Sequence, residues 1–389
     1  MRHAALILAS LIVWAGPALA DEAITLGDRE GRQPAIATDE KGIVHAAYVS
    51  YEPGGKVPDV FHASSSDGRT WEATRNVSRS TALSYDPAIA CGKGGRVAIV
   101  WVDTASKGMA APDIEVVLSG DGGKSWSSPV NVSRTGGKSM EPAVAIAADG
   151  TIHVVWSDTT RSESGPRLWH TASTDKGASW SEPRSILRSP GDARRPAIAC
   201  GKDGALHVAW VDQIGERTVP DIAFATSHDG GKTFTRPLDL SMAALGATDP
   251  GLAVDDTGIY AVWAEASKPA GGWGIKFAAS RDGGHTWEAR LDLAPTIGQS
   301  TEPAIASDHG KIAVVWRDTS RHEPSPDVWI SLSADEGKTF GETHNLSDNP
   351  GTASHPGVAL AGGRIFAAWQ ESDRGFSYVL VMSTPFFDR

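Results

Sequence analysis

The sequence has little cysteine, an excess of negative over positive charge, and few long apolar runs. Its 389 residues include two cysteines, Cys91 and Cys200. The patterns Cys-x-x-Cys, His-Glu-x-x-His and Gly-x-Ser-x-Gly are absent, which excludes the common zinc motifs and the nucleophile turn of α/β-hydrolases. A helical apolar period is also absent throughout. These absences point away from helical and metal-motif proteins.

Apolar character is concentrated at the start of the chain. Residues 1–20, "MRHAALILASLIVWAGPALA", combine a basic start, an apolar run and the small-residue ending Ala18-Leu19-Ala20. This order predicts a signal peptide with cleavage before Asp21, and therefore a secreted or periplasmic protein. No later stretch approaches the roughly 18 apolar residues of a membrane helix, so we expect no membrane insertion. The absence of a cysteine directly after the cleavage site argues against lipid attachment there.

Negative charge dominates the remainder. The formal net charge is -11, and removal of Arg2 with the signal peptide gives -11 - 1 = -12. An acidic exported chain is a poor nucleic-acid binder. We expect a monomer whose partner is a glycan, a small polar ligand or another protein. No cofactor is evident, and Ca²⁺ is the cation we consider.

One short motif returns along the chain. "SGDGGKSW" (119–126) looks like a phosphate-binding loop, but that pattern needs a glycine where Leu118 stands. The pattern Ser-x-Asp-x-Gly-x-(Ser/Thr)-(Trp/Phe) recurs, once in a shorter form. Its aspartates are Asp67, Asp121, Asp175, Asp229, Asp282 and Asp335, at intervals of 54, 54, 54, 53 and 53. The spacing indicates a structural repeat.

A second motif keeps the same spacing and occurs seven times. Each copy begins with a proline and reads as an apolar strand, a glycine-bearing turn and a second strand that ends in Trp or Tyr. The prolines are Pro34, Pro87, Pro142, Pro196, Pro250, Pro303 and Pro356. A third strand leads into each Asp motif, as at 113–119, 221–227 and 327–333, and a fourth follows it, as at 129–133, 237–241 and 343–347.

Four antiparallel strands in a unit of about 53 residues are typical of a β-propeller blade. The seventh unit has a third strand at 377–383 but no fourth, whereas residues 22–27 resemble a fourth strand that precedes the first unit. We therefore predict an all-β fold, with residues 21–389 forming a single seven-bladed β-propeller of four-stranded antiparallel blades. The N-terminal strand pairs onto the last blade and closes the ring, which removes open sheet edges.

Most repeated residues are explained by the fold. The aspartate of the Asp motif can accept hydrogen bonds from its own turn, and the tryptophans that end the second strands are expected between blades. Cys91 and Cys200 lie two blades apart, beyond the roughly 7 Å that a disulfide tolerates, so we predict two buried thiols. Trp273 has no counterpart in the other units and is either a sugar-stacking platform or part of a local cluster.

The positions at which the units differ indicate a candidate site. The residues before the repeated prolines should ring one channel mouth, and they are Gln33, Asp86, Glu141, Arg195, Asp249, Glu302 and His355. A second ring follows the strand-two aromatics, at Asp103, Asp158, Asp212, Glu265, Asp318 and Glu371. A third comprises Asp59, Asp113, Asp221 and Asp327. Such a concentration of carboxylates is either a functional signature or a set of turn-capping residues.

The Asp motifs give the chain its resemblance to a known superfamily. The chain resembles the sialidase superfamily of Asp-box, or BNR-repeat, proteins over almost all of residues 21–389. The resemblance implies a propeller in which Arg32, within Arg32-Gln33-Pro34, contacts a substrate carboxylate and Asp59 acts as acid/base. Arg195 would be a further arginine contact and Tyr378 a nucleophile. The match departs from sialidases in its seven blades, where sialidase catalytic domains have six, and in having no motif around Arg195 or Tyr378.

Two functional hypotheses follow. In the first, the protein is a non-catalytic exported propeller that binds a ligand, cation or partner protein at its acidic channel mouth. In the second, it is a sialidase-like exo-glycoside hydrolase that acts on glycans. We favour binding, because the repeats account for nearly every carboxylate.

Overall fold

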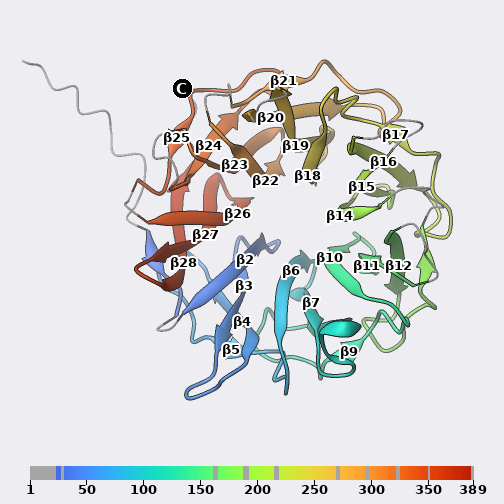
Figure 1. The fold of residues 1–389 in the computed structure, drawn as a ribbon, viewed down its shortest axis with the longest axis vertical. Coiled ribbons are helices and arrows are strands. Elements are labelled where there is room, and N and C mark those ends of the chain that lie inside the picture. The colour runs from blue at the N-terminus through green and yellow to red at the C-terminus, as the bar shows by residue number, and fades with distance from the viewer. Residues whose placement is uncertain are drawn as a thin grey trace, which may run out of the picture.

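Seven four-stranded sheets are arranged around a central axis (Figure 1). The computed structural model describes residues 23–27, 30–160, 165–186, 192–213, 219–268, 272–294, 298–320, 325–348 and 351–386. The signal peptide predicted at 1–20 lies outside these ranges. The sheets confirm the seven-bladed, all-β prediction, and η1 (Gly108–Ala110) is a single 3-10 turn between two strands.

Each blade has its first strand nearest the axis and its fourth strand at the rim (Figure 1). Blade 1 comprises β2 (Gly31–Thr38), β3 (Val44–Tyr51), β4 (Pro58–Ser65) and β5 (Arg75–Asn76). Blade 2 comprises β6 (Ser84–Gly92), β7 (Arg96–Asp103), β8 (Asp113–Ser119) and β9 (Val130–Asn131). Blade 3 comprises β10 (Ser139–Ile146), β11 (Ile152–Asp158), β12 (Arg167–Ser173) and β13 (Arg184–Ser185).

The remaining blades follow the same order. Blade 4 comprises β14 (Arg194–Cys200), β15 (Leu206–Asp212), β16 (Asp221–Ser227) and β17 (Leu238–Asp239). Blade 5 comprises β18 (Ala247–Val254), β19 (Ile259–Lys268), β20 (Gly272–Ser280) and β21 (Leu291–Asp292). Blade 6 comprises β22 (Ser300–Asp308), β23 (Lys311–Asp318), β24 (Asp327–Ser333) and β25 (His344–Asn345). Blade 7 comprises β26 (Thr352–Ala361), β27 (Arg364–Asp373), β28 (Phe376–Pro385) and β1 (Ile24–Thr25).

The two ends of the described chain meet in blade 7. Strand β1 pairs antiparallel with β28, with Ile24 opposite Val381 and Thr25 opposite Leu380. Leu26, just beyond β1, donates its backbone N–H to the Val379 carbonyl over 2.8 Å. This pairing confirms the predicted ring closure and completes the fourth sheet position of the last blade.

Bulky side chains at the ends of the second strands fill the spaces between blades. Trp101, Trp156, Trp210, Trp263, Trp316 and Trp369 are all at most 2% exposed. Each packs against the preceding blade, as Trp156 does against Val100 and Val116, and Tyr48 of blade 1 packs on Val379 of blade 7. The hydrophobic core is therefore a chain of inter-blade layers that closes on itself, as the equivalence of the tryptophans predicts.

The Asp motif forms the hairpin between strands three and four. In blade 2, Asp121 Oδ1 accepts hydrogen bonds from Ser119 Oγ (2.8 Å) and the Ser125 N–H (2.9 Å). Ser125 also donates its hydroxyl to Oδ2 over 2.6 Å. These bonds, those from Ser125 above all, lower the pKa of Asp121 to about 2. The structural interpretation of the Asp motif is thus supported by its hydrogen bonds.

In several blades the second glycine position of the Asp motif lies against a histidine or phenylalanine ring of the preceding blade, whereas Gly177 lies against Leu118. Gly123 has φ +80°, and a Cβ there would collide with the His62 ring. Box residue Trp126 meets the same ring edge-on, at 4.8 Å between centroids. Glycine is needed here both for the left-handed backbone and for the close approach.

Cys91 and Cys200 are free thiols, as predicted, but are half-buried rather than fully enclosed. Both line one cavity of about 240 Å³, together with Ile146 of the blade between them. Burial, with a smaller effect from Asp149, raises the pKa of Cys200 to about 12, and burial and Asp39 raise that of Cys91 further.

The raised pKa values give a testable reactivity. We expect both thiols to react slowly with Ellman's reagent at about pH 8 in native buffer, because the thiolate is the reactive form. Two thiols per chain should then be titrated in guanidinium chloride. A titre near zero in denaturant without reductant would show a disulfide and contradict the assignment.

Candidate ligand site at the channel mouth

Three acidic rings lie on one face of the propeller, opposite the Asp-motif hairpins. Strand pairing places the start of the first strand beside the end of the second and the start of the third. In blade 2, Ser84 lies opposite Asp103, which lies opposite Asp113. The same arrangement recurs around the ring, so the rings predicted from the sequence share a face.

The first ring has an unusual backbone. Each of its residues forms a bulge in the innermost strand and has a left-handed φ between 50° and 56°. These residues are Gln33, Asp86, Glu141, Arg195, Asp249, Glu302 and His355. Non-glycine residues seldom adopt this conformation without support from their surroundings.

Side chains of the first ring supply that support from blade to blade. Gln33 Oε1 accepts the N–H of Asp86 (3.1 Å), and the Asp86 carboxylate accepts the N–H of Glu141. Glu141 Oε2 accepts the N–H of Arg195 over 2.8 Å.

Similar links continue around the ring. Glu302 Oε2 accepts the N–H of His355 (2.7 Å), and Gln370 Oε1 accepts that of Gln33 (3.2 Å). Arg195 forms an ion pair with Asp249 of the next blade. Many of the side-chain oxygens of the first ring therefore accept hydrogen bonds from a neighbouring blade.

The second and third rings are largely committed to local hydrogen bonds. Trp101 Nε1 donates to Asp103 Oδ2 (3.1 Å), and Trp210 Nε1 donates to Asp212 Oδ2 (2.9 Å). Asp59 is 5% exposed and accepts Ser78 Oγ, Asn76 Nδ2 and the Ser80 N–H at 2.7 to 2.9 Å. These contacts favour the turn-capping interpretation of both rings.

A cavity of about 300 Å³ opens on this face where blade 3 meets blade 4. Its lining includes Lys138, Met140, Glu141, Ser157 and Arg194. Glu141 Oε2 accepts both Ser157 Oγ (2.7 Å) and the Arg195 N–H, which fixes the carboxylate and directs its hydrogen bonds through one oxygen. Met140 is 39% exposed and adds an apolar surface. The cavity thus combines an acceptor, two cations and an apolar patch.

Asp86 is the titratable neighbour of this cavity. Burial, followed by the charge of Glu141, raises its pKa to about 6, although Arg195 and the Glu141 N–H act in the opposite direction. A carboxyl group with a pKa of about 6 is partly protonated in mildly acidic solution. Such perturbed carboxyl groups are frequent in functional sites.

The residues assigned by resemblance to sialidases are divided among three blades, with Arg32 and Asp59 both in blade 1. Arg32 forms an ion pair with Glu30 (3.3 Å) in blade 1, while Arg195 pairs with Asp249 at the border of blades 4 and 5. Tyr378 lies on β28, the third strand of blade 7, opposite Glu371. Arg32 and Arg195 are thus each paired with a carboxylate of their own.

Trp273 lies within strand β20. It packs against the core between blades 5 and 6, and a parallel bridge joins it to Gln299. Its surroundings favour the local-cluster alternative.

Metal and membrane features are limited in the described ranges. There, no three His, Cys, Asp or Glu side chains are grouped to hold a metal ion. Likewise, within this part of the chain, no helix has the length and apolar character to span a membrane.

Sequence reasoning identified Glu141 but missed its neighbours in the cavity. Met140 and Arg194 stand one residue before the first-ring positions of blades 3 and 4, and Ser157 precedes the second-ring Asp158. The same alignment of repeats could have found them, had the flanking columns been compared.

The repeat architecture matches a known protein family. The BNR repeat-like domain family matches residues 95–218 and 195–384. The chain belongs to this family. A search of curated proteins gives no match for this BNR repeat-like protein.

Solved structures similar to this BNR repeat-like propeller include a protein of unknown function from Dyadobacter fermentans. It is 15% identical, with 94% of this chain and 98% of that chain covered and a TM-score of 0.56. An ulvan polysaccharide lyase is 12% identical, with 94% and 96% covered and a TM-score of 0.65. A Hadza microbial sialidase is 17% identical, with 85% and 73% covered and a TM-score of 0.55. These similarities show a sialidase-like propeller fold.

Proposed function

We propose that this protein is an exported, non-catalytic propeller that binds acidic polysaccharide in the cavity between blades 3 and 4. The observation that carries the proposal is the lining of this cavity. Lys138 provides positive charge for a sugar carboxylate or sulfate, and Arg194, whose Nε is paired with Asp192 Oδ1 (2.8 Å), keeps its other guanidinium N–H groups for the same anion. Glu141 and Ser157 can bind sugar hydroxyls. Among proteins of similar fold, a sialidase and a polysaccharide lyase are named for carbohydrate substrates.

Binding rather than turnover is supported by the state of the other carboxylates. Asp59 directs both oxygens to hydrogen bonds within blade 1, and Asp103 accepts the indole N–H of Trp101. A catalytic acid needs an accessible proton in contact with the substrate. Asp59 of the third ring and Asp103 of the second ring are instead hydrogen-bonded within the fold.

Affinity electrophoresis on immobilised polygalacturonate, with dextran as the neutral polymer, tests this proposal. We expect retardation on polygalacturonate alone, and a loss of at least about tenfold in affinity for Lys138→Gln with Arg194→Gln. Glu141→Gln should also weaken binding. Its amide oxygen can still accept the Arg195 N–H, as Gln33 does for Asp86, so the fold should be preserved.

Glu72→Gln is the matched control, because Glu72 is exposed beside the Asp-motif hairpin of blade 1. It should bind as the wild type does. Equal retardation of wild type and the Lys138/Arg194 double variant would place the ligand elsewhere.

One observation favours a second candidate, a sialidase-like exo-glycoside hydrolase. The raised pKa of Asp86, about 6, next to Glu141 suits a general acid beside a second carboxylate. Turnover of fluorogenic sialosides or other glycosides would then fall as the pH rises through about 6 and be lost in Asp86→Asn. Turnover lost instead in Arg32→Ala and Asp59→Ala would support the sites assigned by resemblance. No turnover across the panel would exclude this candidate.

A further inference from the structure

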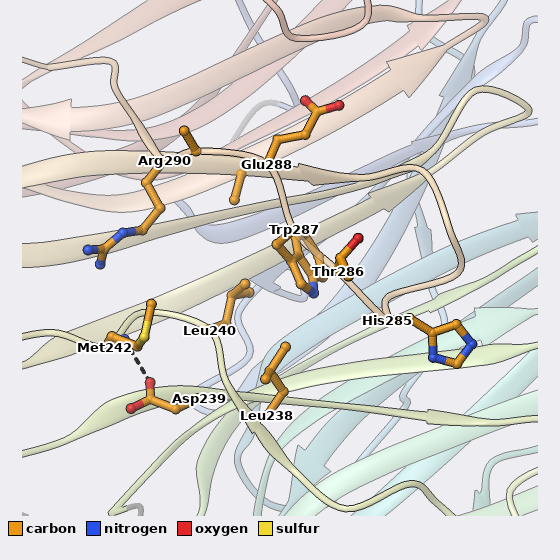
Figure 2. A pocket seen from close by; sticks show the side chains of 11 residues that line it. Leu238, Asp239, Leu240, Met242, His285, Thr286, Trp287, Glu288 and Arg290 are labelled. Carbon is orange, nitrogen blue, oxygen red and sulfur yellow. Dashed lines mark hydrogen bonds between the residues drawn. The ribbon is translucent and has the colours of Figure 1, made fainter.

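A groove separate from the channel mouth runs along the border of blades 4 and 5. Its larger part, about 420 Å³, lies between the β17 edge of blade 4 and the Asp-motif hairpin of blade 5 (Figure 2). Its apolar lining includes Leu238, Leu240, Met242 and Trp287. A second cavity of about 190 Å³ shares Leu238 and His285 with it, so the two cavities are adjacent.

The apolar surface extends beyond the groove onto the protein exterior. Met242 is 62% exposed, and Leu238 and Leu245 are each 40% exposed. These three are among the eight large hydrophobic residues most exposed in the described chain, and they fall within eight consecutive positions. An exposed apolar cluster around a pocket is typical of an interaction surface.

The other blades show that the fold does not require a hydrophobic residue at Met242. Arg79 and Arg134 occupy the same turn in blades 1 and 2, with φ of 45° in both cases against 43° at Met242. All three donate their backbone N–H to the side chain three residues earlier, which is Asn76, Asn131 or Asp239. Figure 2 shows this bond between Met242 and Asp239. An exposed methionine replaces an exposed arginine without any change of backbone.

Charge within the groove is uneven. Glu288 on one wall forms an ion pair with Arg281, with 3.0 Å between Oε1 and Nε. Arg290 forms an ion pair with Glu265, with 3.4 Å between Nη1 and Oε2. Arg236 lines the smaller cavity, is exposed, and has no ion-pair partner among the described residues. The uncompensated charge at that end is therefore positive, on a protein whose net charge is -11.

We propose that this groove binds an extended segment of a partner protein that presents a bulky apolar side chain followed by an acidic residue. The apolar side chain fills the cavity beside Trp287, and the acidic residue reaches Arg236 past His285. Leu245 is not part of the cavity lining, so a small ligand in the groove would leave it uncovered, whereas a protein segment that crosses the rim can cover both Met242 and Leu245. Buried anchors of this kind, surrounded by polar groups, dominate protein interfaces.

Selection from a phage-displayed random peptide library on the full-length protein tests the proposal. The library is first depleted on Met242→Arg, which restores the residue of blades 1 and 2. We expect enriched peptides to carry an aromatic or long aliphatic residue followed by Asp or Glu. Labelled synthetic versions should lose about tenfold or more in affinity on Met242→Arg, measured by fluorescence anisotropy. Arg236→Glu should weaken them further, and increasingly so at low salt.

Arg134→Met is the matched control, because it makes the reciprocal change in blade 2 and should leave peptide affinity unchanged. Thermal unfolding of Met242→Arg should match the wild type. The proposal is overturned if no peptide is enriched over the Met242→Arg surface, or if the enriched peptides lack either feature. It is also overturned if sedimentation velocity shows that the wild type self-associates through this face and Met242→Arg does not.

Discussion

Acidification from about pH 7 to about pH 5 is expected to destabilise this propeller by several kcal/mol, because histidines are buried between its blades. In blade 1, His45 Nδ1 lies 3.1 Å from His62 Nε2, and in blade 3 His153 Nδ1 lies 3.1 Å from His170 Nε2. All four side chains are at most 3% exposed. One proton fits between the two facing nitrogen atoms of each pair. If both rings were protonated, two N–H groups would face each other without an acceptor between them.

The local charges do not compensate for burial. Burial, then the neighbouring histidine and an arginine, lowers the pKa of His62 and of His170 to about 3 from 6.5. The arginines are Arg75 and Arg184. Asp39 beside His45 and Asp149 beside His153 favour protonation, but burial outweighs both, and the pKa of His153 is about 4.

The direction of the effect follows from proton binding. The folded pKa values lie below 6.5, so the unfolded chain binds more protons below that pH. The contribution of these histidines to the free energy of unfolding is then constant above about pH 6.5 and falls as the pH decreases toward 4. Asp86 and Glu115 act in the opposite direction, because burial raises their pKa values to about 6 and about 7 and the folded state binds more protons there at pH 5. One pKa unit corresponds to 1.36 kcal/mol, which gives about 2 kcal/mol per buried histidine at pH 5. The Asp motifs, with pKa values near 2, lose stability only below about pH 4.

The variant His62→Phe with His170→Phe isolates this effect. Blades 4 and 5 carry Phe224 and Phe277 at the equivalent positions, each meeting a box aromatic of the next blade edge-on. Phenylalanine therefore fits the site. Urea denaturation followed by tryptophan fluorescence should show a pH-dependent loss smaller by roughly 4 kcal/mol at pH 5. The exposed His309→Asn is the control, and an unchanged pH dependence in the double variant would refute the explanation.

The blade architecture could be predicted because the nearly constant interval between repeats gives the position of every strand within its unit. The third strands predicted at 113–119, 221–227 and 327–333 have those bounds in the structure. The fourth strands are shorter than predicted, two residues instead of five, as at Val130–Asn131. Ser133, the last residue predicted there, turns its hydroxyl toward Asp113 (3.2 Å) instead of continuing the strand. In a polar strand at the rim, hydrogen bonds from side chains can replace the backbone hydrogen bonds of the sheet. The alternation of polar and apolar residues does not reveal this replacement.

The division between structural and available carboxylates could not be predicted. Glu141 and Arg195 are 54 positions apart, and their 2.8 Å bond depends on how closely two blades approach. In the sequence, a carboxylate that is hydrogen-bonded between blades cannot be distinguished from one that is available to a ligand. Met242 could not be recognised from its charge, because it is an apolar residue at a position that is arginine in blades 1 and 2.

Replacement of Asp158 should separate these two kinds of carboxylate. Asp158 is 0% exposed and accepts Ser139 Oγ and Thr135 Oγ1, both over 2.6 Å, and the Thr160 N–H over 2.5 Å. Asp158→Ala leaves these buried donors without an acceptor, so we expect a loss of roughly 3 kcal/mol or more in the free energy of unfolding. Urea denaturation at about pH 7.5, where the buried histidines are neutral in both states, measures the loss directly.

The comparison with Glu141→Gln determines what the second ring does. If Asp158 only supports the fold, the folded fraction of Asp158→Ala keeps its affinity for polygalacturonate although it unfolds in less urea. Glu141→Gln should behave in the opposite way, with weakened binding and a urea midpoint close to that of the wild type. Wild-type stability combined with lost binding in Asp158→Ala would instead place the second ring within the ligand site. The stability and affinity of these two variants together assign each ring its role.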